Sequence, residues 1–405
     1  MNTLTYLNHL GITCALGDGV DAVRQSLLSS HTPHSMTCSE AYSAPGQGPL
    51  MLGIVHEPLA TLTLPAPYQT RCNALLWQAA APLTTHLDAC KARYGADRIA
   101  VILGVSTSGL PEGESARRYW NEHACWPDSF DYAQQELGQP AQFLAAHWQL
   151  NGPAYTIATA CSSGAKALAA GARLLQANLA DIVIAGGCDV LSQFTIAGFS
   201  ALESVSNERC QPLSRNRQGI NLGEAASVFL MSREPAANIS CAEQLVLAGW
   251  GETGDAHHLS APDPSGQGAI RAMQKALQHA GITGQDIDYI NLHGTATQQN
   301  DAMEALAVAH VFGSSVPVSS TKPLTGHTLA AAGALEAAFA WLCLRDNPHG
   351  RLPPHWWDGQ YDQTLPPISP VPPNFQLGRP ARYIMSNSFA FGGNNACLIL
   401  GRGPL

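Results

Sequence analysis

The chain has 405 residues, of which 45% are hydrophobic and 13% are charged, and its formal net charge is −9. Soluble domains average ~25% charged residues, and disordered chains combine low hydrophobicity with high net charge. This composition therefore excludes intrinsic disorder and predicts a large core in two or three domains, or in one large composite domain. The negative charge also argues against nucleic-acid binding through a general basic surface.

The predicted strands and helices alternate along the chain. Short apolar runs predict buried strands at 98–104, 181–187, 225–231, 288–292 and 396–400. Helical stretches rich in Ala and Leu are predicted at 163–179, 268–280, 301–311 and 332–344. This alternation indicates an α/β fold. A boundary near residue 245 divides the chain into two halves, 1–245 and 246–405.

The N-terminal residues show no targeting signal, because Met1 to Tyr6 has no Lys or Arg before its apolar residues. The longest apolar stretch, Leu329 to Leu344, contains Glu336 and is too short to span a bilayer. We therefore expect a cytoplasmic protein without a membrane span.

The cysteine at position 161 stands out among the eleven cysteines of the chain. It follows the extended segment 155–158 and precedes a helical stretch, so it lies at the N-terminus of a helix. Unpaired N–H groups and the positive end of the helix dipole stabilise a thiolate there and can lower its pKa. Cys161 is thus a candidate nucleophile, although a buried cysteine in a tight turn would fit equally well. The other ten cysteines include no CxxC pair and are expected to be buried, reduced thiols.

Three further segments carry candidate site residues. His293 follows a predicted strand and precedes a glycine, and His327 follows Gly326 just before a helix. Either histidine alone would be interpreted as structural, and their spacing does not place them beside Cys161. The segment 386–395 contains Gly392 and Gly393 after an aromatic residue. It suits a loop that brings backbone N–H groups close to a ligand, or a bulged hairpin.

Together, the segments 159–164, 291–301, 319–336 and 385–395 resemble the β-ketoacyl-acyl carrier protein synthases, which are condensing enzymes of fatty acid and polyketide assembly. The pattern with two histidines is similar to the elongating synthases of that family. The resemblance implies a thiolase-like α/β fold, in which two similar halves form a five-layered αβαβα sandwich. The first half would carry the nucleophilic cysteine and the second half the two histidines. No cofactor is implied.

The resemblance also implies a role for each residue of the site. Cys161 would accept the acyl group, His293 and His327 would assist malonyl decarboxylation, and Lys322 would organise the site electrostatically. Phe391 would be a gate whose backbone N–H, with that of Cys161, forms an oxyanion hole. The remaining supporting residues would be Glu336 in the Lys322 network, Thr295 and Thr297 on the pantetheine arm, and Phe389. No metal is required, but the resemblance allows an optional structural cation near Asn291, Glu336, Ser386 and Asn387, where relatives can bind one.

The implied partner is acyl carrier protein, which is strongly acidic and requires a local basic patch on an acidic enzyme. Arg209, Arg215 and Arg217 form the clearest cluster of basic residues. A solvated charged loop is the competing interpretation of these arginines. The resemblance implies a homodimer, and pairing with a ketosynthase-like subunit stays open.

The sequence departs from the pattern of the housekeeping fatty-acid enzymes in several places. Thr107, for example, stands where relatives have a bulky aliphatic residue that lines the acyl tunnel. Such departures are similar to synthases of specialised pathways, including aryl polyene clusters.

Two competing functions are weighed against this resemblance. A thiolase would use a second catalytic cysteine near its C-terminus, but Cys397 lies inside an apolar strand. A non-catalytic subunit of the chain-length-factor type would lack the nucleophile, which is present here as Cys161. An acyltransferase of the ketosynthase class is therefore the favoured prediction.

Overall fold

A single bent sheet of twelve strands runs through the molecule, and its two ends belong to the two halves of the chain. The computed structural model describes residues 4–403 except 44–45, 47, 237–239 and 241–242. In the first half the neighbouring strands are β1 (Tyr6–Cys14), β8 (Ala225–Ser232), β7 (Ile182–Asp189), β5 (Ile99–Gly104) and β6 (Ala154–Ile157). In the second half they are β9 (Leu245–Gly254), β14 (Asn394–Arg402), β13 (Tyr383–Ala390), β10 (Tyr289–Asn291), β11 (Pro317–Ser319) and β12 (Ser369–Pro370).

The two halves of the sheet are connected at one point. There β1 pairs with β9 at Tyr6 and Val246. At the other end of β1, a two-residue strand, β2 (Gly17–Asp18), pairs with Thr13 and Cys14. A separate small sheet consists of β3 (Thr37–Ser39) and β4 (Leu50–Leu52).

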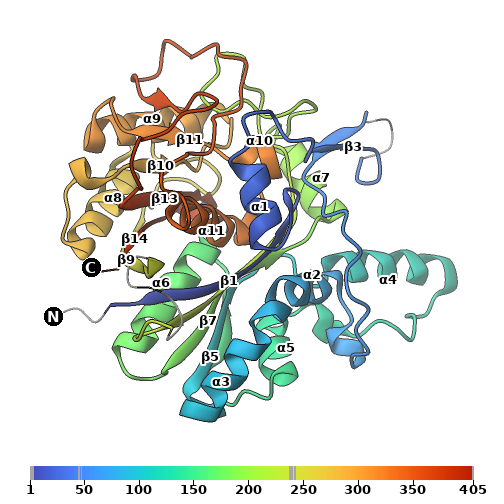
Figure 1. Ribbon diagram of the computed structural model, residues 1–405. Coiled ribbons are helices and arrows are strands. Elements are labelled where there is room, and N and C mark those ends of the chain that lie inside the picture. The colour runs from blue at the N-terminus through green and yellow to red at the C-terminus, as the bar shows by residue number, and fades with distance from the viewer. Residues whose placement is uncertain (1–3, 44–45, 47, 237–239, 241–242, 404–405) are drawn as a thin grey trace.

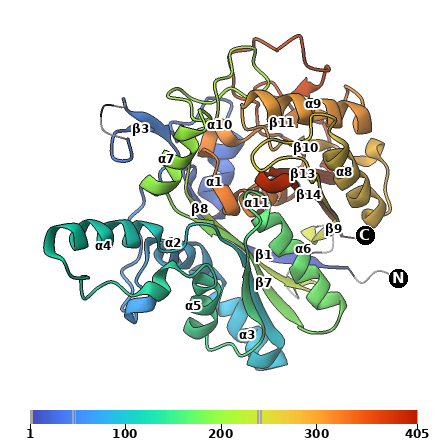
Figure 2. The ribbon, with the colours of Figure 1, turned by 180° about the vertical axis from the view of Figure 1, so that it is seen from behind.

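Helices cover the sheet on both faces and fill the space inside its bend, as Figures 1 and 2 show from opposite sides. The central layer contains α6 (Ser163–Gln176) and α11 (Ala332–Leu344), which contact each other and both halves of the sheet. The outer layer of the first half contains α2 (Arg71–Ala80), α3 (Thr84–Tyr94) and α5 (Gln139–His147). The outer layer of the second half contains α8 (Gln267–Ala280) and α9 (Gln298–Phe312). This is the thiolase-like arrangement in five layers.

The remaining helices flank these layers. They are α1 (Val20–Leu27), α4 (Leu110–His123), α7 (Gln193–Ala201) and the single turn α10 (Lys322–Thr325). Among the described helices, none is long and apolar enough to cross a membrane.

The small residues of the central helices explain why the layers approach so closely. All thirteen residues of α11 are buried. Its Gly333 lies against α6, because a Cβ added there would lie 2.7 Å from the backbone nitrogen of Ala165. Since a helix buried on every side is apolar all round, this layer accounts for the low charge content of the chain.

The predicted strands and helices are all present with shifted ends, and the expected boundary falls where β9 begins, at Leu245. The expectation for the cysteines was partly wrong. Among the ten that the structure describes, Cys38 and Cys125 are exposed and Cys90 is half-buried. None of these ten forms a disulfide.

Candidate active site

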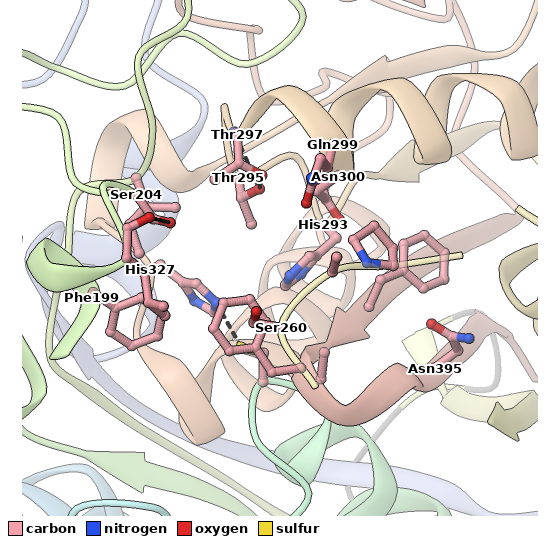
Figure 3. A pocket seen from close by; sticks show the side chains of 18 of the residues that line it. Phe199, Ser204, Ser260, His293, Thr295, Thr297, Gln299, Asn300, His327 and Asn395 are labelled. Atoms are coloured by element: carbon pink, nitrogen blue, oxygen red, sulfur yellow. Dashed lines mark hydrogen bonds between the residues drawn. The ribbon is translucent and has the colours of Figure 1, made fainter. Parts of the chain in front are cut away.

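The fold brings the three most distinctive predicted residues to one point. Cys161 lies between β6 and α6, His293 follows β10, and His327 lies between α10 and the short 3-10 helix η7 (Leu329–Ala331). The cysteine sulfur and one nitrogen of each imidazole lie within 4.8 Å of one another, and all three residues are buried. Figure 3 shows both histidine rings pointing into a common cavity below Thr295 and Thr297.

His327 is held in the orientation that directs its Nε2 to the nucleophile. Its Nε2 lies 2.9 Å from Cys161 Sγ, and its Nδ1 accepts the backbone N–H of Leu329 at 3.3 Å. A neutral imidazole carries one hydrogen, so an Nδ1 that accepts leaves Nε2 as the donor. The ring therefore presents an N–H group to the sulfur.

His293 is fixed through its backbone and its Nδ1. The N–H groups of His293 and Gly294 donate to the carboxylate of Glu304 at 2.8 and 2.7 Å. Lys322 Nζ lies 3.5 Å from Nδ1, which makes this nitrogen the acceptor and Nε2 the donor. The rings of His293 and His327 meet edge to face, with centroids 5.2 Å apart. The Phe389 ring borders His293, with a centroid distance of 6.3 Å.

Lys322 and Glu336 form a buried ion pair behind the histidines. Lys322 Nζ lies 2.5 Å from Glu336 Oε1, and both side chains are almost completely buried. Burial raises the pKa of Glu336 to about 7, against the opposing effect of the Lys322 charge. The pair therefore places one buried positive charge beside His293.

Burial determines the charge state of the three reacting side chains. Desolvation, followed by the positive charge of Lys322, lowers the pKa of His293 and of His327 well below the usual range, so both rings are neutral at pH 7. Burial also raises the pKa of Cys161 to about 12, although Lys322 opposes this. The expectation of a lowered cysteine pKa was wrong, because the desolvation of the buried sulfur outweighs the helix N-terminus.

Glu304 was not predicted from the sequence. It is a buried residue of α9, and burial raises its pKa to about 7 against the backbone hydrogen bonds from Gly294 and His293. Nothing in a single acidic residue of a helical stretch separates it from solvent-exposed glutamates. Only the fold places its carboxylate under the turn that carries His293.

The residues expected around a cation are divided between two faces of the sheet. Asn291 and Ser386 are paired across β10 and β13, on the face that packs against α11 and its Glu336. Among the described residues, Asn291 Oδ1, Ser386 Oγ and Glu336 Oε2 are buried without a hydrogen-bond partner, as ligands of a hard cation would be. The Asn387 side chain points to the opposite face and donates to Glu304 at 3.2 Å. Three of the four expected side chains thus fit a cation.

Two cavities meet at Cys161. The first, of about 160 Å³, is also lined by both histidines, Thr295 and Thr297, whose hydroxyl oxygens lie 2.9 Å apart. The second, of about 370 Å³, is mainly apolar. Its walls include Ser106, Leu110, Phe194, Leu202 and Leu329.

Phe391 and Phe199 border both cavities, and their ring centroids lie 5.6 Å apart. The first cavity has a mixed lining with the larger polar share and is called the polar cavity below, and the second is called the apolar cavity; the sulfur is reached from both. Thr107 does not line either cavity, since its hydroxyl is bonded to Asp189 at 2.7 Å. Ser106 occupies that wall instead.

The three arginines do not form one exposed patch. Arg217 is buried and donates to Asp362 at 2.6 Å, so its inclusion in a docking surface was wrong. Arg209 is half-buried and donates to the carbonyl of Pro33, whereas Arg215 is exposed. The spacing of the three arginines in the sequence could not show that one is buried, one half-buried and one exposed.

Comparisons with known proteins agree with this geometry. The model described as "Beta-ketoacyl synthase, N-terminal domain" matches residues 72–237, and "Beta-ketoacyl synthase, C-terminal domain" matches residues 245–356. The chain is 38% identical to 3-oxoacyl-[acyl-carrier-protein] synthase 2 of Rhizobium meliloti over 63% of its length and 62% of that relative. It is 33% identical to the enzyme of the same name from Staphylococcus aureus over 75% of its length and 77% of that relative.

Two solved structures extend the comparison to the whole chain. The first is the ketosynthase ApeO in complex with its chain length factor ApeC from Xenorhabdus doucetiae. It has a TM-score of 0.90 and 42% identity, with coverage of 99% of this chain and 98% of the other. The second is the ishigamide ketosynthase/chain length factor, with a TM-score of 0.85, 25% identity and full coverage of both chains.

Proposed function

The chain belongs to the β-ketoacyl synthase family, and on that premise we propose that it is a 3-oxoacyl-[acyl-carrier-protein] synthase, an acyltransferase that condenses an acyl thioester with a malonyl thioester. The observation that carries the proposal is the Cys161 sulfur, 2.9 Å from His327 Nε2 at the junction of a polar and an apolar cavity. No redox cofactor enters this reaction.

The first half-reaction transfers the acyl group to Cys161. The Cys161 thiol gives up its proton and its sulfur attacks the thioester carbon. The bond to the carrier sulfur breaks, and the carrier leaves as a thiol after taking up a proton. The N–H of His327 Nε2 stabilises negative charge on the attacking sulfur, which offsets part of the burial that raises its pKa. The backbone N–H groups of Cys161 and Phe391 are the proposed donors to the oxyanion of the tetrahedral intermediate.

The second half-reaction uses the two histidines as neutral donors. A malonyl thioester enters from the cavity that both rings line, and its bond to the carboxylate breaks with loss of CO₂. The electron pair remains as an enolate, whose oxygen accepts from His293 Nε2 and His327 Nε2. The enolate carbon then attacks the acyl carbon on Cys161, and the cysteine sulfur leaves. Burial, followed by the charge of Lys322, keeps both rings neutral by lowering their pKa.

The two cavities are assigned to the two ends of the substrate. The apolar cavity takes the acyl chain, because its walls are mainly hydrophobic. The polar cavity takes the pantetheine arm of the carrier beside the hydroxyl groups of Thr295 and Thr297. Arg215, which is exposed, and Arg209 remain the proposed contacts for the acidic carrier protein.

A second chain of the same fold is the proposed partner. The strand β6 lies at the edge of the sheet and pairs only with β5 among the described strands. Tyr155 on β6 is exposed, and Phe194, exposed by 72%, lines the apolar cavity together with Ala160, which lies a few residues beyond this strand. Such an open edge with exposed aromatic residues suits an interface between two chains.

The partner is a second copy or a ketosynthase-like subunit. The ApeO and ishigamide structures, described as ketosynthases with a chain length factor, favour the second alternative. In that case activity would depend on the partner, although this chain carries the nucleophile.

The proposal also covers the pathway, the cellular location and the roles of the two halves of the chain. The 42% identity to ApeO over almost the entire chain favours a specialised pathway of the aryl polyene type over general fatty acid synthesis. We propose that the enzyme works in the cytoplasm. We also propose that residues 1–245 supply the nucleophile and residues 246–405 the two histidines, in line with the residue ranges of the two family models.

The proposal is tested by intact-mass spectrometry after incubation with a panel of acyl carrier proteins that bear different acyl groups. We expect one acyl group to be added to the wild-type chain and none to Cys161→Ala, whose condensation rate should fall by at least ~10³-fold. Cys210→Ala, which replaces another buried cysteine, serves as the control and should be acylated normally. Acylation of Cys161→Ala would refute the assigned nucleophile.

A further inference from the structure

Asp189, the last residue of β7, is completely buried. Its carboxylate accepts five hydrogen bonds. The donors are the backbone N–H groups of Ser106 (2.8 Å), Thr107 (2.8 Å) and Ala330 (2.7 Å), and the hydroxyl groups of Ser106 (2.5 Å) and Thr107 (2.7 Å). Burying a carboxylate is costly unless such donors compensate it. Burial nevertheless raises the pKa of Asp189 against these hydrogen bonds, so a carboxylate kept at this position, outside the reacting groups, calls for a role.

The four hydrogen bonds from Ser106 and Thr107 hold a wall of the apolar cavity. Ser106 and Thr107 follow β5, and Ser106 lines the cavity beside Cys161. The Thr107 hydroxyl also accepts the backbone N–H of Val190 at 3.0 Å, so its side chain is tied to the end of β7 at two points. The loop is thereby fixed with its serine, and not its threonine, toward the acyl chain.

The fifth hydrogen bond, from the backbone N–H of Ala330, links Asp189 to the backbone turn that follows His327. Ala330 follows Leu329, whose φ of +53° is unfavourable for a residue with a side chain. Leu329 is also the residue whose N–H donates to His327 Nδ1. The Asp189–Ala330 bond therefore anchors the strained turn that determines which nitrogen of His327 carries the hydrogen.

Close packing reinforces this anchor. A Cβ added at Gly187 of β7 would lie 3.0 Å from the Cα of Ala331 and 3.2 Å from the carbonyl oxygen of Ala330. The turn after His327 consequently rests directly on β7, and Asp189 binds it at the end of that strand.

We propose that Asp189 is a positioning residue that keeps His327 Nε2 protonated and aimed at Cys161 while it fixes the adjoining wall of the acyl cavity. This inference rests on the proposed ketosynthase function. Asp189 touches neither substrate nor reacting atoms. Its effect reaches His327 through Ala330 and Leu329 and reaches the cavity wall through Ser106, and its negative charge adds to the raised pKa of Cys161.

The decisive variant is Asp189→Asn, which preserves the size of the side chain. One amide NH₂ would replace one oxygen, and the orientation that retains the bonds from the backbone N–H groups of Ser106 and Thr107 turns this NH₂ toward the N–H of Ala330 and the hydroxyl of Ser106. We expect kcat for malonyl-carrier decarboxylation to fall by about 10- to 100-fold, the effect of a misplaced catalytic group, with a smaller change in KM.

Two controls separate positioning from general loss of stability. Asp288→Asn makes the same change at a buried carboxylate that binds Arg379 and the backbone N–H of Arg382, away from the site. It should lower the melting temperature but leave kcat for decarboxylation within about twofold. Thr107→Val, at a residue that lines neither cavity, removes one hydroxyl donor to Asp189 and the acceptor for the N–H of Val190, and it leaves the bond to Ala330. It should lower the melting temperature and preserve decarboxylation.

The outcomes are distinct. Decarboxylation by Asp189→Asn within about twofold of wild type, or reduced in the same proportion as in Asp288→Asn, overturns the inference. If Asp189→Asn does not fold, Thr107→Val decides: retained decarboxylation supports the role of the Ala330 bond, and a loss as large as that of His327→Ala overturns it. Wild-type protein that neither acylates nor condenses would instead refute the proposed function.

Discussion

At the scale of single residues, the site combines side chains whose usual charges are changed by burial. Two neutral histidines, one buried lysine and one thiol lie within a few ångströms, and the pKa of each histidine is lowered first by burial and then by Lys322. Neutral rings are what the second half-reaction requires, because Nδ1 of each ring accepts a hydrogen bond and Nε2 donates. Lys322 thus acts on the reaction through the charge state of its neighbours.

Lys322→Met is expected to change the pH dependence of decarboxylation. Since the lysine charge lowers the pKa of both histidines, its removal raises these pKa values, and the rings become protonated at a higher pH. A protonated His327 would turn an N–H at Nδ1 against the N–H of Leu329. The acid limb of the pH–rate profile should therefore move to higher pH, and the rate at neutral pH should fall by about tenfold.

Lys91→Met is the matched control for this change. Lys91 lies on α3, where it donates to the carbonyl of Trp148 far from the histidines. Its pH profile should coincide with that of the wild type. An acid limb that stays in place in Lys322→Met would contradict the electrostatic role.

At the scale of elements, the site depends on how tightly α6 and α11 pack. Gly333 of α11 and Gly164 of α6 lie at this contact, and a Cβ added at Gly164 would lie 2.8 Å from the backbone nitrogen of Ala334. The contact places the N-terminus of α6, and with it Cys161, against the segment that carries His327. Small residues at two positions are thus a condition for the 2.9 Å distance between sulfur and imidazole.

Gly333→Ala should destabilise the enzyme by about 1–3 kcal/mol, because the added methyl group would overlap backbone atoms of α6 that cannot move independently. Chemical denaturation measures the change in the free energy of unfolding. Gly198→Ala on α7 is the control, since a Cβ there meets no atom within 4 Å among the described residues. It should be neutral or stabilising by up to ~1 kcal/mol. Equal stability of both variants would disprove the packing argument.

The sequence predicted the helices and strands well, but it predicted the burial and pKa of individual side chains poorly. Short continuous apolar runs predicted the strands, and stretches rich in Ala and Leu predicted the central helices. Elements buried on both faces are apolar along their whole length, which makes them easy to recognise in a sequence. Cys161, His293 and His327 were found through the motifs around them. The burial of Arg217, the raised pKa of Cys161, and the contributions of Glu304 and Asp189 escaped prediction. These properties arise from contacts between segments distant in the chain, which no local pattern encodes.

At the scale of the whole molecule, the open edge at β6 is the most consequential surface. Phe194, exposed by 72%, lines the apolar cavity together with Ala160, which follows β6, so a partner chain that covers this region would also close the acyl site. The assembly and the substrate chamber are therefore expected to depend on each other.

Phe194→Asp is expected to weaken association by more than about tenfold, because it places a charge in an apolar interface. Native mass spectrometry and light scattering at several concentrations measure the change, with the ketosynthase-like subunit present or absent. Leu306→Asp on α9, another exposed apolar position remote from β6, is the control and should associate normally. Unaltered association of Phe194→Asp would exclude this face as the interface.

The meeting of two cavities at one sulfur also determines the order of events in time. In the proposed assignment of the cavities, the acyl carrier and the malonyl carrier both present their thioesters to Cys161 from the cavity that contains Thr295 and Thr297, so they are expected to occupy the same place in succession. The first carrier has to depart before the second can dock. Meanwhile the acyl group stays bonded to Cys161, with its chain in the apolar cavity. Turnover thus follows a ping-pong scheme, in which each carrier is a substrate of one enzyme form and a competitor of the other.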